Sequence, residues 1–157
     1  MKTVTILTLA AGLGLAASAA AHESDATLGA INAAKENACP AGRTQANARS
    51  EAFGPQKDVT IVQLATVPQK GEPARRVRLV RVTVAPGGVI GWHEHSGDQG
   101  MAILVSGTAT ELRNDCRDPI AHKAGDILLE SENTAHGFRN TGQVPAVFLV
   151  SHGLPKD

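Results

Sequence analysis

The sequence predicts an all-β domain of the sandwich or barrel class, and three observations support this prediction. From residue 58 onward the chain consists of short runs rich in valine, isoleucine, leucine and threonine. Glycine, proline or polar turns separate these runs about every ten residues, as in closely spaced strands. None of the runs has a convincing helical periodicity. A chain of 157 residues is long enough for one such domain with one modest core.

Residues 1–21 are expected to form a secretory signal peptide. Lys2 precedes an apolar run over residues 4–15 that is too short to span a bilayer, and Ala19 and Ala21 are small enough for a cleavage site. A buried N-terminal helix is the alternative. With a leader removed near His22, the mature protein is expected to be periplasmic or secreted and to have no further membrane segment.

Residues 22–57 are polar and rich in alanine, and they are expected to form an extension packed on the side of the domain. Leu28 and Ile31 recur at helical spacing, so part of this extension is expected to be helical, within Ala26 to Asn37. The sequence CPAG at residues 39–42 is expected to end that helix.

The two cysteines, Cys39 and Cys116, are expected to form a disulfide in an exported protein. This bond would link the extension to a later hairpin, and the long loop that it closes is worth about 4 kcal/mol in the loop-entropy account. A free thiol pair and metal ligation are the alternatives, although neither cysteine has a histidine or a second cysteine at ligand spacing.

The barrel is expected over residues 58–157. Within it, Val80, Val82 and Val84 alternate on one face of a strand. An arginine cluster on the same segment is expected to be an exposed face of an edge strand, with an anion-binding site as the alternative. The cluster comprises Arg75, Arg76, Arg78 and Arg81. Strands are expected at residues 60–67, 77–85, 101–107, 108–112, 124–130, 136–140 and 146–152.

The charge balance argues against large anionic partners. The chain has 15 basic and 15 acidic residues, and loss of Lys2 with the signal peptide would leave a net charge of −1 with histidine neutral. Neither nucleic acid nor an anionic membrane surface is therefore an expected partner. The absence of tyrosine and the 3% aromatic content also disfavour an extended stacking platform, so a small molecule is the expected ligand.

Three histidines could form a metal site. His93 and His95 are two apart, which places both imidazoles on one face of a strand, and His136 lies in a second strand-like segment. Fe, Mn, Ni, Cu and Zn as divalent ions all accept neutral imidazole, and three ligands leave coordination positions open. The alternative is that these histidines are structural and bind backbone partners. Of the other histidines, His122 and His152 are expected at the surface or at strand ends, with His152 closer to the mouth of a cavity.

The pattern around these histidines resembles the two motifs of the cupin superfamily, G-x5-H-x-H-x3,4-E-x6-G and G-x5-P-x-G-x2-H-x3-N. Gly87, His93, His95 and Gly107 match the first motif, and Gly125, His136 and Asn140 match the second. The resemblance extends over residues 77–152. It implies a small jelly-roll barrel, also called a double-stranded β-helix, with a metal inside and with edges that a homodimer commonly covers.

The first motif lacks its glutamate, since Gly100 stands at that position. Gln99 is a candidate replacement ligand, and Asp98 is another if the loop after His95 turns inward. Glu94 is expected on the opposite strand face. In the second motif, Ser131 and Asn133 replace the usual proline and glycine. No side chain stands out as a general base, so the resemblance favours a three-histidine metalloenzyme of dioxygenase type that acts on a small organic substrate. The alternative is a non-catalytic barrel that binds a small ligand or a metal.

Overall fold

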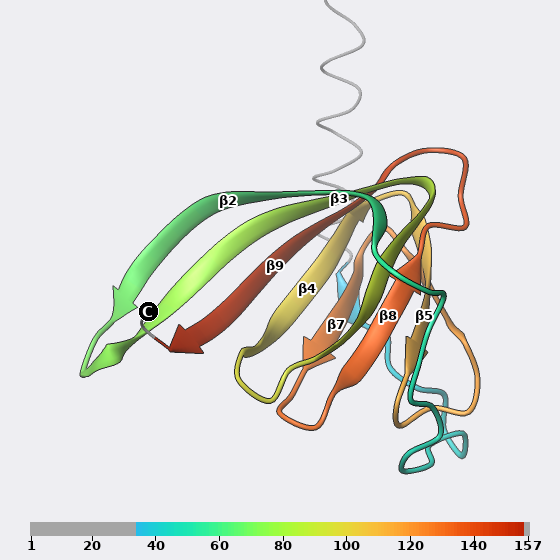
Figure 1. Ribbon diagram of the computed structural model, residues 1–157, viewed down its shortest axis with the longest axis horizontal. Coiled ribbons are helices and arrows are strands. Elements are labelled where there is room, and N and C mark those ends of the chain that lie inside the picture. The colour runs from blue at the N-terminus through green and yellow to red at the C-terminus, as the bar shows by residue number, and fades with distance from the viewer. Residues whose placement is uncertain (1–33, 156–157) are drawn as a thin grey trace, which may run out of the picture.

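The computed structural model describes residues 34–155, and this part of the chain is all-β (Figure 1). The strands are β1 (Lys35–Glu36), β2 (Lys57–Gln69), β3 (Glu72–Glu94), β4 (Gln99–Ser106), β5 (Thr108–Arg113), β6 (Ile120–Lys123), β7 (Asp126–Glu130), β8 (Ala135–Arg139) and β9 (Ala146–Pro155). They form one sheet in the order β1-β7-β4-β9-β3-β8-β5-β6, with β2 paired to β3. Figure 1 shows that the sheet curls into a half-barrel, which agrees with the expected all-β class.

The prediction of a helix within residues 26–37 is wrong for residues 34–37, the part that the structure describes. Lys35 and Glu36 form β1 and pair in parallel with β7. The Lys35 and Asn37 amides donate to the carbonyls of Gly125 and Ile127, so tertiary pairing replaces the local bonds of a helix. Residues 26–33 and the predicted signal peptide lie outside the described residues. Within residues 34–155, no helix is long and apolar enough to cross a membrane.

Strand β3 is the longest strand and bends in the middle. Its first half, up to Val84, pairs with β2 and β9, and its last part, from Val89 to Glu94, pairs with β8. The bend falls at residues 86–88, where Gly87 has a φ of 74° that favours glycine. A Cβ on Gly88 would lie 2.9 Å from the Ala85 carbonyl oxygen. The Pro-Gly-Gly sequence therefore turns one strand around a corner of the barrel and brings its histidine end opposite β8.

The core lies on the concave side of the curled sheet. The predicted inward face of Val80, Val82 and Val84 is confirmed, since all three are buried. The Phe138 and Phe148 rings pack in the same cluster with their centroids 5.5 Å apart. The core comprises Val80, Val82, Val84, Ala102, Leu104, Ala109, Leu128, Phe138, Ala146, Phe148 and Val150.

The described part of the N-terminal extension is bound to the barrel beyond β5. The disulfide predicted between Cys39 and Cys116 is present, and its two cysteines are 77 positions apart in sequence. Thr44 also forms a bridge with Cys116, and the Arg43 guanidinium pairs with Asp118 at 2.5 Å. These contacts hold residues 39–49 against the loop that follows β5.

The arginines of β3 do not lie on an edge strand, so the prediction that they form an exposed face of an edge strand is wrong. β3 has β2 on one side and β9 on the other along this segment. Arg75 and Arg81 are exposed, whereas Arg78 is half-buried and alternates with Val80 and Val82 on the inward face. The strand therefore places the Arg78 guanidinium inside the curve of the sheet.

Candidate metal centre

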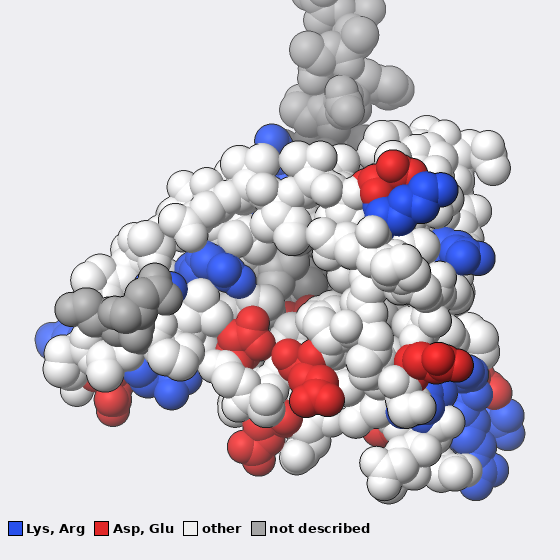
Figure 2. Space-filling model, viewed as in Figure 1, with Lys and Arg blue, Asp and Glu red and all other residues white. Residues whose placement is uncertain are grey.

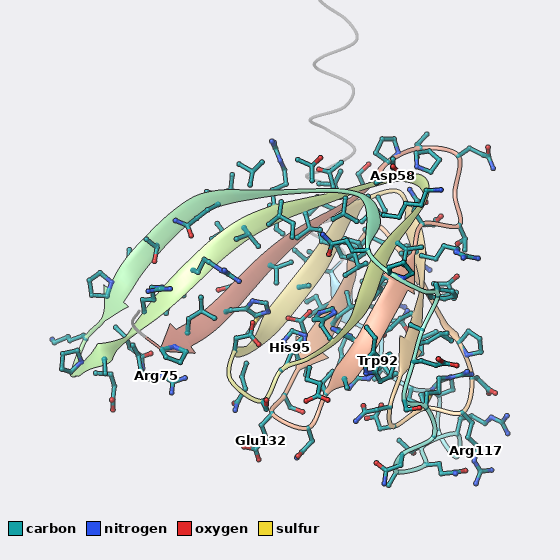
Figure 3. All side chains as sticks on the ribbon, in the orientation of Figure 1. Asp58, Arg75, Trp92, His95, Arg117 and Glu132 are labelled. Atoms are coloured by element: carbon teal, nitrogen blue, oxygen red, sulfur yellow. A yellow bond between two sulfur atoms is a disulfide. The ribbon has the colours of Figure 1, made fainter. Side chains whose placement is uncertain are left out.

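The three predicted histidines come together on the concave side of the sheet. His93 on β3 lies opposite His136 on β8 in the strand ladder, and His95 directly follows β3. One nitrogen from each ring lies within 4.8 Å of the others, and the Nε2 atoms of His95 and His136 are 2.9 Å apart. Figure 3 shows His95 within the curve of the sheet, whereas Glu132 and Arg117 lie on the outside. The bend in β3 thus produces the convergence that the motif spacing predicts.

Each of these histidines has its Nδ1 atom next to an acceptor. The acceptors are the Gly91 carbonyl at 3.0 Å from His93, the Asp98 carbonyl at 3.1 Å from His95 and the Glu111 carboxylate at 2.6 Å from His136. A neutral imidazole that donates from Nδ1 keeps a lone pair on Nε2, which is the form that binds a metal. Two such lone pairs repel at 2.9 Å unless a proton or a cation lies between them. The donor set therefore fits a divalent transition metal.

Burial favours the neutral state of His93. The pKa of this imidazole is lowered first by burial and then by the neighbouring His136. A lower pKa keeps the ring unprotonated at neutral pH, so its lone pair remains available to a metal.

A buried carboxylate supports the site from behind. Glu111 on β5 is fully buried and accepts hydrogen bonds from His136 at 2.6 Å and from His122 at 2.9 Å. Burial raises the pKa of the Glu111 carboxyl, but the hydrogen bonds from His122 and His136 and the charges of these two imidazoles together lower it by more, to about 2. His122 is expected at the surface or at a strand end; it lies next to the end of β6, but at 2% exposure it is not at the surface. Glu111 shares the inward face with Ala109, and this alternation is the sequence signal that could have identified it.

A second buried carboxylate, Glu130, lies at the end of β7 beside the histidines. His152 Nε2 donates to Glu130 Oε2 at 2.5 Å, and Glu130 Oε1 is 3.9 Å from His136 Nε2. Burial raises the pKa of the Glu130 carboxyl, but the hydrogen bond from His152 and the charges of His136, His95 and His152 together outweigh burial, so the pKa is lowered overall. Glu130 is therefore an anion at neutral pH, and one of its oxygens faces the histidine cluster.

The register of the sheet explains why the first motif has glycine at position 100. Gly100 on β4 lies opposite Glu130 on β7 and opposite His152 on β9. A Cβ at this position would lie 2.0 Å from the Ser151 carbonyl oxygen and 2.5 Å from His152 Cδ2. No side chain fits there. The motif lacks a carboxylate at Gly100, but Glu130, opposite it on the neighbouring strand, provides one on the same face of the sheet.

The loop after His95 turns inward through Asp98, whereas Gln99 is exposed and does not line the cavity. Asp98 Oδ1 is 3.4 Å from His95 Nδ1, and Asp98 Oδ2 is 3.8 Å from His152 Nδ1. His95, Asp98 and His152 offer a second group of ligand atoms within 4.8 Å of one another. Of the two candidate replacements, the structure thus brings Asp98 and not Gln99 to the site. Glu94 is exposed, as expected.

A cavity of about 460 Å³ opens beside the histidines. The space-filling view shows it as a hollow between the arm formed by β2, β3 and β9 and the rest of the barrel (Figure 2). His152 lines it, as expected for a histidine near a cavity mouth. Apolar side chains form most of the wall, namely Ile61, Val80, Val82, Ile90, Ala102, Phe138, Phe148 and Val150. A site of this size and composition suits a small organic molecule.

The comparisons with known proteins agree with this geometry. Residues 80–152 match the family model described as Cupin domain. The barrel is a cupin domain. No curated protein is a significant match to the sequence. The cupin resemblance of the sequence is thereby confirmed, and the site described above lies inside the matched segment.

Solved structures similar to this cupin share its fold at low sequence identity. A Thermotoga maritima protein described as a predicted oxalate decarboxylase has 22% identity and a TM-score of 0.52, over 71% of this chain and 90% of that one. An oxalate oxidase in complex with glycolate has 21% identity and a TM-score of 0.51, over 61% and 51%. The cupin domain of Schizosaccharomyces pombe Cnp3 has 13% identity and a TM-score of 0.50, over 68% and 70%. These likenesses support the cupin barrel.

Proposed function

We propose that this cupin binds a divalent transition metal through His93, His95 and His136 and acts as a metalloenzyme of dioxygenase type on a small organic substrate. The supporting observation is the convergence of three ring nitrogens, each on an imidazole whose Nδ1 already faces an acceptor. Fe, Mn, Ni, Cu and Zn all suit such ligands, and availability decides much of the occupancy.

We further propose that Glu130 supplies the carboxylate that the first motif lacks. Its Oε1 atom lies 3.9 Å from His136 Nε2, and its Oε2 atom is held by His152. Glu130 is buried, and Gly100, at the place of the family glutamate, lies directly opposite it on the neighbouring strand. Asp98 is held further along the loop, beside His95 Nδ1 and not beside Nε2.

The residues of the chain have defined tasks in such a site. Glu111 fixes the orientation of the His136 ring, and the Gly91 carbonyl does the same for His93. The apolar wall keeps water away from the reacting atoms. A bound metal would act as a Lewis acid and provide a binding position for O2 or a substrate oxygen.

Export to the periplasm or to the outside of the cell belongs to the same proposal. The leader-like segment at residues 1–21 and the disulfide both suit a protein that folds in an oxidising compartment. A second copy of the chain is the proposed cover for β2, which within residues 34–155 pairs only with β3 and exposes Leu64 and Val67.

Metal binding is the first test of the proposal. The wild-type protein, stripped with a chelator and reloaded with each ion separately, is expected to bind about one equivalent of at least one transition metal, measured by elemental analysis. His93→Ala should lose this metal. Glu130→Gln should bind the metal at least about tenfold more weakly. Gln99→Ala, at an exposed position on the neighbouring strand β4, should match the wild type.

Two outcomes would contradict the proposal. Less than about a tenth of an equivalent of every ion in the wild type would remove the metal centre. Equal affinities of Glu130→Gln and wild type would remove Glu130 as a ligand and leave the three histidines in place.

Turnover separates the enzyme from the alternative, a barrel that binds a small ligand or metal without catalysis. O2 consumption by the loaded protein is measured against a panel of thiols, diketones and phenols. The proposal expects turnover of at least one compound that His93→Ala abolishes. Metal binding with no turnover across the panel would favour the non-catalytic barrel.

A further inference from the structure

The cavity contains a cation, the Arg78 guanidinium, that no described residue neutralises. Arg78 on β3 lines the cavity, and its Nε atom is buried without a hydrogen-bond partner. No carboxylate among residues 34–155 forms an ion pair with its guanidinium. The nearby acids are engaged elsewhere, because Glu130 accepts from His152 and Asp98 faces His95 and His152. A half-buried guanidinium without an anion is costly unless a ligand supplies one.

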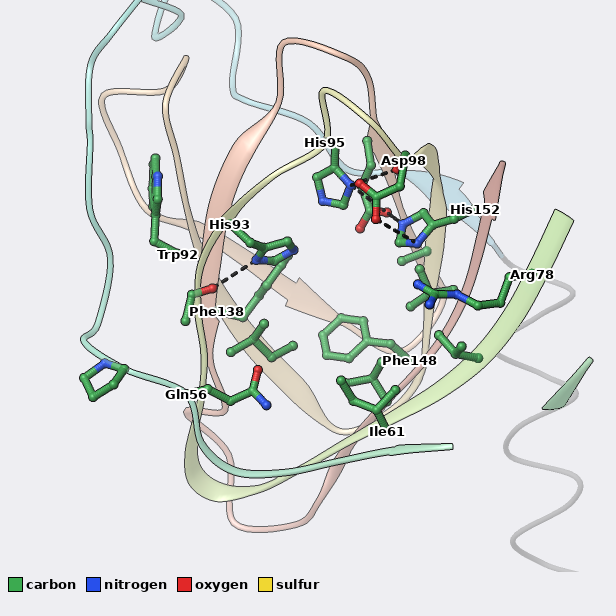
Figure 4. Close-up of a pocket in the computed structure, with 18 of the residues that line it drawn as sticks. Gln56, Ile61, Arg78, Trp92, His93, His95, Asp98, Phe138, Phe148 and His152 are labelled. Carbon is green, nitrogen blue, oxygen red and sulfur yellow. Dashed lines mark hydrogen bonds and ion pairs between the residues drawn. The ribbon is translucent and has the colours of Figure 1, made fainter. Parts of the chain in front are cut away.

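The position of Arg78 relative to the histidines is set by the ladder. Arg78 lies directly opposite His152 on β9, and the His152 ring centroid is 5.2 Å from that of His95. Figure 4 shows the Arg78 side chain extending into the cavity beside His152 and above Phe148 and Ile61. An anionic group bound to Arg78 would therefore lie on the side of the cavity that also faces the histidine cluster.

The remaining wall requires an apolar partner. Ile61, Val82 and Phe148 line the same cavity as Arg78 and present no polar side-chain atom. A small dianion such as oxalate would leave this surface in contact with water. A ligand with one anionic end and one hydrocarbon or aromatic end would satisfy both the guanidinium and the apolar wall.

We propose that the cavity binds a small amphipathic carboxylate, with the carboxylate on the Arg78 guanidinium and the apolar body against Ile61, Val82 and Phe148. Arginine suits this task because its planar fork donates two parallel hydrogen bonds to one carboxylate. The inference deepens the proposed function, since it names the substrate class of the same cavity, but the arginine contact itself needs no metal.

Benzoate and benzamide provide the test, because they share a ring and differ in charge. Titration calorimetry measures both with wild-type protein, once stripped of metal and once loaded. Benzoate is expected to bind at least about tenfold more tightly than benzamide in the stripped protein, as for a hydrogen bond between charged groups. Oxalate is expected to bind more weakly than benzoate to the stripped protein because it has no apolar body.

Variants of the same strand assign the effect to Arg78. Arg78→Gln should lose the preference for benzoate over benzamide, and Arg78→Lys should retain only part of it. Arg81→Gln is the matched control, since Arg81 is exposed on the opposite face of β3. Far-ultraviolet circular dichroism and thermal unfolding establish that each variant is folded before its affinities are compared.

The outcomes distinguish this inference from the proposed function. Discrimination by Arg78 in stripped protein supports the carboxylate site even if no metal binds. An equal affinity of wild type for benzoate and benzamide, or a wild-type preference that persists in Arg78→Gln, overturns the carboxylate site even if the metal centre is present. Tighter binding of oxalate than of benzoate to stripped protein would overturn the role of the apolar wall.

Discussion

Glu111 connects the stability of the barrel to the protonation of the histidine site. Its carboxylate is buried between His122 and His136, and hydrogen bonds hold its pKa at about 2, below the ordinary value of 4.5. The folded protein therefore binds this proton less readily than the unfolded chain. The resulting stabilisation is present above about pH 4.5 and is lost as the pH falls towards 2.

Replacement of Glu111 by glutamine is expected to destabilise the metal-free protein at pH 7 by about 2 kcal/mol or more, because two buried imidazoles lose a charged acceptor. Urea unfolding at pH 7, 5 and 3 measures the effect, and the gap between wild type and variant should narrow at pH 3. Glu132→Gln, at an exposed position, serves as the control. A gap that is constant from pH 7 to pH 3 would contradict the assignment of the low pKa.

The sequence predicts some residues of the site and not others, for a physical reason. His93, His95 and His136 are recognisable because two are alternate residues of one strand and all three belong to a spaced motif. Glu130 and His152 belong to no motif. Their strands, β7 and β9, lie on either side of β4, and both residues are opposite Gly100 of that strand. Their inward parity could be read from the alternation in β7 and β9, but their proximity depends on strand order, which alternation does not determine.

At the scale of the strand, Gly100 is the position where packing rules out the family residue. Gly100→Ala would place a Cβ 2.0 Å from the Ser151 carbonyl oxygen. This requires β4 and β9 to separate locally, and we expect a loss of about 1–3 kcal/mol in the free energy of unfolding. Denaturant unfolding with Gly97→Ala as control provides the measurement, since a Cβ at Gly97 meets no atom within 4 Å.

A Gly100→Ala variant as stable as the wild type would show that β9 yields easily at this point. In that case the space beside His152 would accept a side chain from β4, and the argument that glycine is required there would fail.

Most strands could be predicted from the alternation of apolar residues and from turn residues. The predicted and observed elements differ where pairing with a distant strand overrides the local sequence pattern. The strand expected to end at residue 85 continues to Glu94 because Pro86 to Gly88 bend it without interrupting it. The expected helix fails at Lys35 and Glu36 because the edge of β7 provides hydrogen-bond partners. Neither pairing partner is adjacent in sequence, so a local pattern contains no information about it.

At the scale of the whole molecule, the disulfide connects the extension to the barrel. Gly54, Pro55 and Gln56, at the end of this extension, also line the cavity. The loop closed between Cys39 and Cys116 is long, so the bond strongly restricts the unfolded chain. Loss of the bond should therefore affect both the stability of the fold and the order of one cavity wall.

The double variant Cys39→Ser, Cys116→Ser is expected to lose about 2–5 kcal/mol of unfolding free energy. Urea unfolding compares it with the oxidised wild type, and a wild-type sample treated with reductant should show the same loss. Equal stability of oxidised and reduced protein would indicate that the hydrogen bonds of the extension, such as Arg43 to Asp118, suffice to hold it.

Strand β3 bears Arg78 near one end and His93 near the other, on either side of the Pro86 to Gly88 bend. Each half of the strand is fixed by different neighbours, β9 before the bend and β8 after it. Because strand pairing holds both halves, the angle at the bend sets the distance between the Arg78 guanidinium and the histidines. That distance would select ligands by their length.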